Sequence, residues 1–140
     1  MRTVLVDTGA WIALLIRDDP HHREASKFFK AKPVPRWVVT NAIVAETYTW
    51  LRYHATDPAL AFRFAEEILA GDETGRIKVI RPERGTETVA AALGRRFADV
   101  DLSWPDLISF VVCQDLGIAE VFGFDQHFHL QGLVLLPGIA

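Results

Sequence analysis

The 140-residue sequence is poor in cysteine and has no long hydrophobic run. Its one cysteine, Cys113, lies in an apolar segment and cannot form a disulfide within the chain, which is typical of a reducing compartment. The apolar N-terminal stretch ends at Asp7, too early for a signal peptide, and no segment reaches the length of a transmembrane helix. We therefore expect a cytoplasmic protein with no membrane partner. Because half of the residues are hydrophobic, residues 1–140 can form one core, and we predict a single domain.

The sequence also lacks the excess of basic residues that is typical of proteins that bind nucleic acids. It has 15 lysines and arginines against 18 aspartates and glutamates, which gives a net charge of −3. This deficit does not exclude an RNA partner if several acids share one metal site, because two divalent cations would shift the net charge to about +1. The net charge therefore leaves a nucleic-acid partner open.

The hydrophobic pattern alternates between short strands and longer helices. Segments rich in β-branched residues predict strands at residues 3–6, 37–40, 77–80, 120–124 and 133–136. Helical periodicity predicts helices at residues 10–17, 22–31, 42–54, 59–70, 86–96 and 104–116. We expect Gly71 and Gly75 to break the chain before the third strand and Gly117 to end the last helix. This alternation predicts a three-layer α/β/α domain with a mostly parallel sheet of four or five strands.

Two aspartates directly follow predicted strands. Asp7 comes after the first strand and Asp125 after the fourth. In parallel α/β sheets, ligands bind at the carboxyl ends of the strands, where the strand order reverses. Each aspartate alone could be a helix N-cap or a turn residue. Two of them at equivalent strand ends favour a shared crevice.

Two further acids lie on predicted helices. Glu46 shares an apolar helical stripe with Ile43 and Trp50, where a carboxylate is costly unless it is paired or bound to a cation. A salt-bridged or solvent-reaching Glu46 is the alternative. Asp106 begins the last helix, and residues 103–106 match a capping box with Ser103 as the N-cap. A residue in the first turn can cap the helix and still project toward a ligand, so both roles stay open.

Four carboxylates in one crevice cannot all remain ionised without a cation, because like charges raise one another's pKa. A hard divalent cation relieves this repulsion, and Mg²⁺ and Mn²⁺ prefer carboxylate oxygens as ligands. Such sites support the hydrolysis of phosphodiester bonds. The residues therefore predict a Mg²⁺ or Mn²⁺ site formed by Asp7, Glu46, Asp106 and Asp125.

The four acidic segments resemble, in order and spacing, the motifs of the PIN-domain family. The resemblance covers essentially the whole chain and rests on VLVDT at residues 4–8, NAIVAE at 41–46, DLSWPD at 101–106 and VFGFDQHF at 121–128. It implies a Mg²⁺- or Mn²⁺-dependent endoribonuclease of the VapC type, the toxin half of a toxin–antitoxin pair. It also implies that the four acids bind the metal, that the protein forms a homodimer, and that a small antitoxin protein plugs the site.

Three positions depart from the family's pattern. Gly9 stands where a serine is usual, Leu107 where a small residue is common, and Gly123 where a hydroxyl residue is frequent. None of these changes removes a metal ligand, but Leu107 and Gly123 leave the positioning of the substrate open.

Thr8 and Asp101 lie beside the acidic motifs and could support the metal site. The Thr8 hydroxyl could donate to a water on the metal, or it could cap the helix that follows. Asp101 could orient a ligand or replace one, or it could be an ordinary loop acid. The histidines, His127 among them, lack the spacing of a zinc site and are expected on the solvated surface.

Two other α/β classes are excluded by the residues that they require. A receiver domain needs an acidic pair at the first strand and a lysine after the last strand, and neither is present. A phosphatase of the haloacid dehalogenase type needs an aspartate at position 9, which is Gly9. The remaining alternative to a nuclease is a non-catalytic PIN scaffold that binds RNA or a protein partner.

Overall fold

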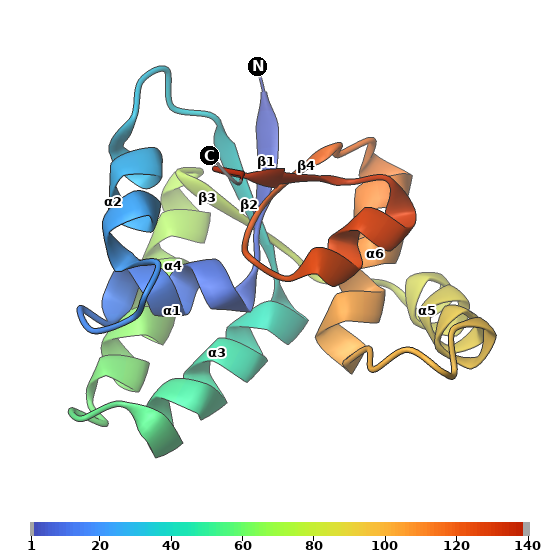
Figure 1. Cartoon of the computed structure of the whole chain (residues 1–140), viewed down its shortest axis with the longest axis horizontal. Coiled ribbons are helices and arrows are strands. Elements are labelled where there is room, and N and C mark those ends of the chain that lie inside the picture. The colour runs from blue at the N-terminus through green and yellow to red at the C-terminus, as the bar shows by residue number, and fades with distance from the viewer. Residues whose placement is uncertain (1, 139–140) are drawn as a thin grey trace.

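A computed structural model describes residues 2–138 as alternating strands and helices (Figure 1). The strands are β1 (Thr3–Val6), β2 (Arg36–Thr40), β3 (Ile77–Ile80), β4 (Glu120–Phe122) and β5 (Val134–Leu136). The α-helices are α1 (Thr8–Leu15), α2 (His22–Lys30), α3 (Asn41–His54), α4 (Leu60–Thr74), α5 (Arg84–Arg96) and α6 (Trp104–Leu116). A 3₁₀ helix, η1, spans Gln126–Gln131.

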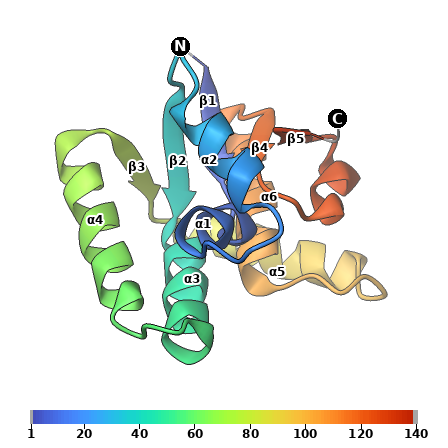
Figure 2. The same cartoon turned by 60° about the vertical axis from the view of Figure 1, so that its left-hand side comes forward.

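The strands form one parallel sheet in the order β3-β2-β1-β4-β5. Helices α1, α2 and α4 cover one side of this sheet, and α5 and α6 cover the other (Figures 1 and 2). Helix α3 continues from the end of β2 and contacts α1, α4 and α6. The predicted three-layer α/β/α fold is therefore confirmed, with five strands that are all parallel.

The hydrophobic core lies on both faces of the central strand and along α6. Val4, Leu5 and Val6 are fully buried, which explains why β1 reads as a continuous apolar run rather than an alternating one. Helix α6 is buried from Asp106 to Cys113. Of the helices in residues 2–138, none combines the length and apolarity needed to cross a membrane.

The strand order reverses at β1, and this reversal positions the acidic residues. Strands β2 and β3 extend the sheet on one side of β1, and β4 and β5 extend it on the other. Val6 pairs with Phe122, and the backbone N–H of Asp7 donates to the carbonyl of Phe122 at 2.9 Å. The carboxyl ends of β1 and β4 are therefore level at the point where α/β sheets bind ligands.

Glycine at position 71 does not break the chain, contrary to the prediction. Helix α4 continues through Gly71 to Thr74 and ends at Gly75, whose φ of +83° is the left-handed conformation of a C-terminal glycine. A Cβ on Gly71 would lie 3.4 Å from the side chain of Ile77. Gly71 therefore allows α4 to pack closely against β3, while Gly75 and Gly117 end their helices as expected.

The segment around Asp125 also differs from the prediction. Strand β4 ends at Phe122 instead of residue 124, and the residues after Asp125, for which no helix or strand was predicted, form η1. Asp125 thus lies three residues beyond its strand, where its Oδ1 accepts a hydrogen bond from the backbone N–H of His127 at 2.9 Å. This bond caps η1 and fixes the Asp125 side chain.

Candidate metal centre

Asp7 lies at the carboxyl end of the central strand with only 6% of its surface exposed. Burial, followed by the charges of Asp106, Glu46 and Asp125, raises the pKa of Asp7 to about 8. A backbone hydrogen bond from Thr8 opposes this shift. The three other acids therefore lie close enough to Asp7 for their negative charges to raise its pKa.

Glu46 lies half-buried in the second turn of α3 and contacts the residue that follows Asp7. Its Oε1 accepts a hydrogen bond from the Thr8 hydroxyl at 2.5 Å. Asp7, not Thr8, is the N-cap residue of α1, and the Thr8 hydroxyl is directed to Glu46 instead of the helix backbone. Thr8 thus ties the first acidic motif to the second.

Asp106 is buried and closes a capping box at the start of α6, as the sequence predicted. Its Oδ2 accepts from the backbone N–H of Ser103 at 3.1 Å, and its own N–H donates to the Ser103 hydroxyl at 3.2 Å. Burial raises the pKa of Asp106, and the charge of Asp125 adds to this, while the hydrogen bonds from Ser103 oppose it. The capping box therefore fixes a carboxylate that also faces the other acids.

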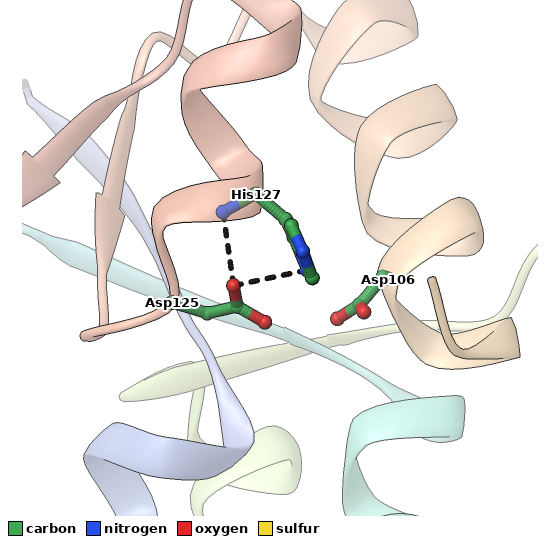
Figure 3. Close-up of side chains that lie close together, drawn as sticks. All are labelled: Asp106, Asp125 and His127. Atoms are coloured by element: carbon green, nitrogen blue, oxygen red, sulfur yellow. Dashed lines mark hydrogen bonds and ion pairs between the residues drawn. The ribbon is translucent and has the colours of Figure 1, made fainter. Parts of the chain in front are cut away.

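Asp125 and Asp106 face each other, with the ring of His127 beside them (Figure 3). One ligand atom from each of these three residues lies within 4.8 Å of the other two. The Nδ1 atom of His127 is 3.2 Å from Oδ1 of Asp125. The side chain of His127 is 37% exposed, so it is partly solvated as expected, but the first turn of η1 also brings it back toward Asp125, which the sequence pattern did not predict.

Asp101 does not share the burial of the four acids. It is exposed in the loop before α6, so its support of the site stays a prediction. The exposed His21 and His129 are likewise outside the acidic cluster: His21 stacks on Phe124 and pairs with Glu24.

The structure explains why position 123 is a glycine. A Cβ on Gly123 would lie 3.0 Å from the Cβ of Asp7 and 3.5 Å from its Oδ2. A hydroxyl residue there would therefore press on Asp7. At Gly9, in contrast, an added Cβ would meet no atom within 4 Å, so the missing serine is not excluded by packing.

Leu107 is directed toward α5, although it directly follows Asp106. A Cβ on Gly94 of α5 would lie 2.9 Å from Cδ1 of Leu107, and Leu107 is only 7% exposed. The large residue on α6 is thus accommodated by a glycine on the facing helix. This packing places the Leu107 side chain in the core.

The buried cysteine near the acids is not a nucleophile. Burial raises the pKa of the Cys113 thiol to about 12, and the charge of Asp7 contributes to this shift. A thiol with this pKa stays protonated near neutral pH and reacts slowly. The reactive groups of the site are its carboxylates and the imidazole of His127.

The residues of the site fit a hard divalent cation. The ligand atoms are carboxylate oxygens, which Mg²⁺ and Mn²⁺ prefer. The raised pKa values of Asp7 and Asp106 show that the site disfavours additional negative charge. A cation among these groups would favour their ionised forms and remove this penalty.

The family model of the PIN domain matches residues 4–131. The chain belongs to the PIN-domain family. The matched residues of this PIN domain include all four acids, from Asp7 to Asp125. No curated protein matches the sequence.

The solved structures that resemble this PIN domain include two crystal structures from different organisms. The crystal structure of VapC20 from Mycobacterium tuberculosis, a toxin that cleaves the sarcin–ricin loop, matches with a TM-score of 0.84 and 27% sequence identity, covering 94% of this chain and 96% of that chain. The crystal structure of PAE2754 from Pyrobaculum aerophilum matches with a TM-score of 0.56 and 19% identity, covering 96% and 90%. The second match shows a shared fold. The first, with the family match, confirms the predicted resemblance to VapC-type PIN-domain ribonucleases.

Proposed function

We propose that this PIN domain is an endoribonuclease that hydrolyses RNA phosphodiester bonds with Mg²⁺ or Mn²⁺ held by Asp7, Glu46, Asp106 and Asp125. The observation that carries the proposal is the gathering of acids at the carboxyl end of the central strand: Asp106 and Asp125 lie together with His127, Glu46 is bonded to Thr8, and Asp7 is buried directly before Thr8. The raised pKa of Asp7, to which the charges of the other three acids contribute, agrees with this arrangement. When bound, the cation supplies positive charge that activates water and stabilises the leaving oxygen.

The residues of the chain hold the carboxylates in fixed positions before substrate binds. The Thr8 hydroxyl holds Glu46, the capping box holds Asp106, and the N–H of His127 holds Asp125. Asp7 is fixed at the end of β1 by burial. Carboxylates that are oriented in advance lose little freedom when they bind a charged ligand, which favours catalysis by positioning.

We also propose that the protein is the toxin half of a toxin–antitoxin pair. The likeness to VapC20 over 94% of the chain supports this role. Because VapC20 cleaves the sarcin–ricin loop, an RNA that contains this loop is the first substrate to test.

An apolar groove on the side of the sheet that carries α1, α2 and α4 supports a protein partner. The groove has a volume of about 600 Å³, and its lining includes Trp11, Phe29, Trp37, Phe64 and Ile77. Most of these side chains belong to the core and form the floor of the groove, and Val34 at its edge is 41% exposed. Apolar grooves of this kind can receive an apolar segment of a partner. We propose that an antitoxin places an apolar segment in this groove.

A homodimer stays part of the proposal. Tyr53 is 82% exposed, Leu69 56% and Phe62 46%, and all three lie on α3 and α4. Large apolar side chains at the surface favour association between copies. Sedimentation equilibrium would then give twice the chain mass of 15.7 kDa.

Cleavage by wild type and Asp7→Asn separates a nuclease from a non-catalytic scaffold. The substrates are a labelled sarcin–ricin loop oligonucleotide and total cellular RNA, with millimolar Mg²⁺. We expect cleavage by wild type and none by Asp7→Asn, whose nearly isosteric side chain keeps the fold, as circular dichroism would show. Equal turnover by the variant would mean that the site is elsewhere. RNA binding without cleavage by wild type would favour the scaffold.

A further inference from the structure

Asp106, Asp125 and His127 form a group that we term the histidine cluster. One ligand atom of each lies within 4.8 Å of the others (Figure 3). Around an octahedral ion with bonds of about 2.1 Å, neighbouring ligand atoms are about 3 Å apart and opposite ones about 4.2 Å. The three side chains are therefore close enough to bind one ion after moving toward one another by side-chain torsion.

His127 directs a ring nitrogen toward the carboxylates without forming a hydrogen bond. Its Nδ1 is buried and has no hydrogen-bond partner among residues 2–138, although it lies 3.2 Å from Oδ1 of Asp125. The ring as a whole is partly exposed, and a buried polar atom of this kind is open to a bound ion or water. The backbone of His127 is fixed by its N–H bond to Asp125, so the ring is held beside the two carboxylates.

We propose that His127 binds the metal ion directly through a ring nitrogen, together with Asp106 and Asp125. This inference rests on the proposed metal-dependent nuclease and adds a nitrogen ligand to its carboxylates. Imidazole is a softer ligand than carboxylate and suits first-row transition ions better than Mg²⁺. The cluster therefore selects Mn²⁺ over Mg²⁺, which a site made of carboxylates alone does less strongly.

His129 provides a matched control on the same 3₁₀ helix. It lies two residues after His127, it is exposed, and it is outside the histidine cluster. His127→Gln and His129→Gln remove the same chemical group from the same element, so a difference between them reports the position of the ring.

Electron spin echo envelope modulation of bound Mn²⁺ tests the inference without any measurement of activity. The sample is the untagged full chain with less than one equivalent of Mn²⁺. We expect coupling of the Mn²⁺ electron spin to ¹⁴N in wild type and His129→Gln, and its loss in His127→Gln. Labelling wild type with ¹⁵N-histidine should replace the ¹⁴N signal, which assigns it to histidine even if His127→Gln does not fold.

Calorimetric titration gives the selectivity. We expect His127→Gln to weaken Mn²⁺ binding at least about tenfold and to change Mg²⁺ binding by less than about threefold, with His129→Gln like wild type. Mn²⁺ that binds wild type without nitrogen coupling would overturn the role of His127 and leave the carboxylate site standing. Absence of any Mn²⁺ binding to wild type would overturn the proposed function as well.

Discussion

Asp7 combines deep burial with three like-charged neighbours, and no other acid in the described part of the chain shows a shift as large. Its pKa of about 8 means that the carboxyl group holds its proton near neutral pH in the metal-free protein. In the unfolded chain the same group ionises near pH 4. The difference couples the stability of the fold to pH, because the folded state binds a proton that the unfolded state has released.

The stability of the metal-free protein should fall between about pH 4 and pH 8. Over this range the folded state keeps the Asp7 proton and the unfolded state does not, so rising pH favours unfolding; above about pH 8 both states are ionised and the effect is complete. Each pKa unit is worth about 1.4 kcal/mol, so we expect a loss of a few kcal/mol. Urea unfolding in EDTA from pH 5 to pH 9 measures it.

Asp7→Asn is the control for this pH dependence, because it removes the titrating group and keeps the side-chain shape. Subtracting its free energies of unfolding from those of wild type cancels the contributions of other groups. We expect the variant to be more stable than wild type at pH 8 and to differ much less at pH 5. Parallel curves for the two proteins would show that Asp7 ionises normally.

Of the side chains in the proposed site, the sequence predicted the four acids and did not predict His127, which the structure places beside Asp106 and Asp125. Asp7 and Asp125 stand out at predicted strand ends and Glu46 on an apolar helix face, whereas Asp106 begins a helix and is recognised by its place in the order of the four acidic motifs. His127 was judged only by the spacing of zinc-binding pairs, which it lacks. The useful signal was local: an aspartate that caps a short helix, followed two residues later by a histidine, places both side chains at the same helix end.

At the scale of elements, α6 shows that a capping residue can also face a ligand site. Both hydrogen bonds of the capping box are present, and Asp106 is nevertheless buried beside Asp125. The negative charge of Asp106 therefore interacts favourably with the N-terminus of α6 and is repelled by the other acids. Substitution can separate the two effects.

Asp106→Asn should be as stable as wild type or more stable in EDTA at pH 7, because it removes a carboxylate with a raised pKa while its amide oxygen can still accept from Ser103. It should also lose most of the thermal stabilisation that millimolar Mn²⁺ gives wild type. Ser103→Ala, the control, should lose up to about 1 kcal/mol and keep the metal response. Melting curves with and without Mn²⁺ measure both. Identical behaviour of the two variants would make Asp106 a cap only.

The contact between Gly94 on α5 and Leu107 on α6 predicts that substitutions at these two positions have coupled effects on stability. Gly94→Ala should destabilise wild type by about 1 kcal/mol, because overpacking against Leu107 outweighs the better helix propensity of alanine. In a Leu107→Val background the same change should be neutral or stabilising, because valine lacks the Cδ1 atom that alanine would meet. Urea unfolding of the four proteins measures the coupling. Additive effects would show that the two side chains do not touch.

Most elements were predictable because their hydrophobic patterns are long or sharply bounded. The exceptions have physical causes. A glycine such as Gly71 usually breaks a helix, but inside α4 its small size allows close packing against Ile77. The segment Gln126–Gln131 carries too few apolar residues to show a helical period, and its 3₁₀ turns depend on the cap from Asp125. A hydrophobic pattern reveals neither the packing of Gly71 against Ile77 nor the single hydrogen bond by which Asp125 caps η1.

At the scale of the whole molecule, the net charge of −3 suits a nuclease only if cations occupy the acidic site. The apolar groove lined by α1, α2 and α4 lies outside the acidic cluster. If the proposed toxin role holds, the site is already ordered before RNA binds, so an inhibiting partner is needed to keep it inactive in the cell.

Expression of the protein alone should therefore arrest growth, and co-expression with the neighbouring gene should restore it. The same experiment with Asp7→Asn should give no arrest, because the variant lacks an essential carboxylate. Colony counts after induction, with immunoblots for soluble protein, measure the effect. Normal growth with abundant soluble wild-type protein would argue strongly against a toxin.

The central claim is that a divalent cation held by the carboxylates is required for RNA cleavage. The most direct test is the initial rate of cleavage of one labelled RNA by metal-stripped protein as Mn²⁺ or Mg²⁺ is added. The rate should be zero without metal, rise to saturation with either ion, and return to zero when EDTA exceeds the metal. Full cleavage by the stripped protein in excess EDTA would contradict the claim.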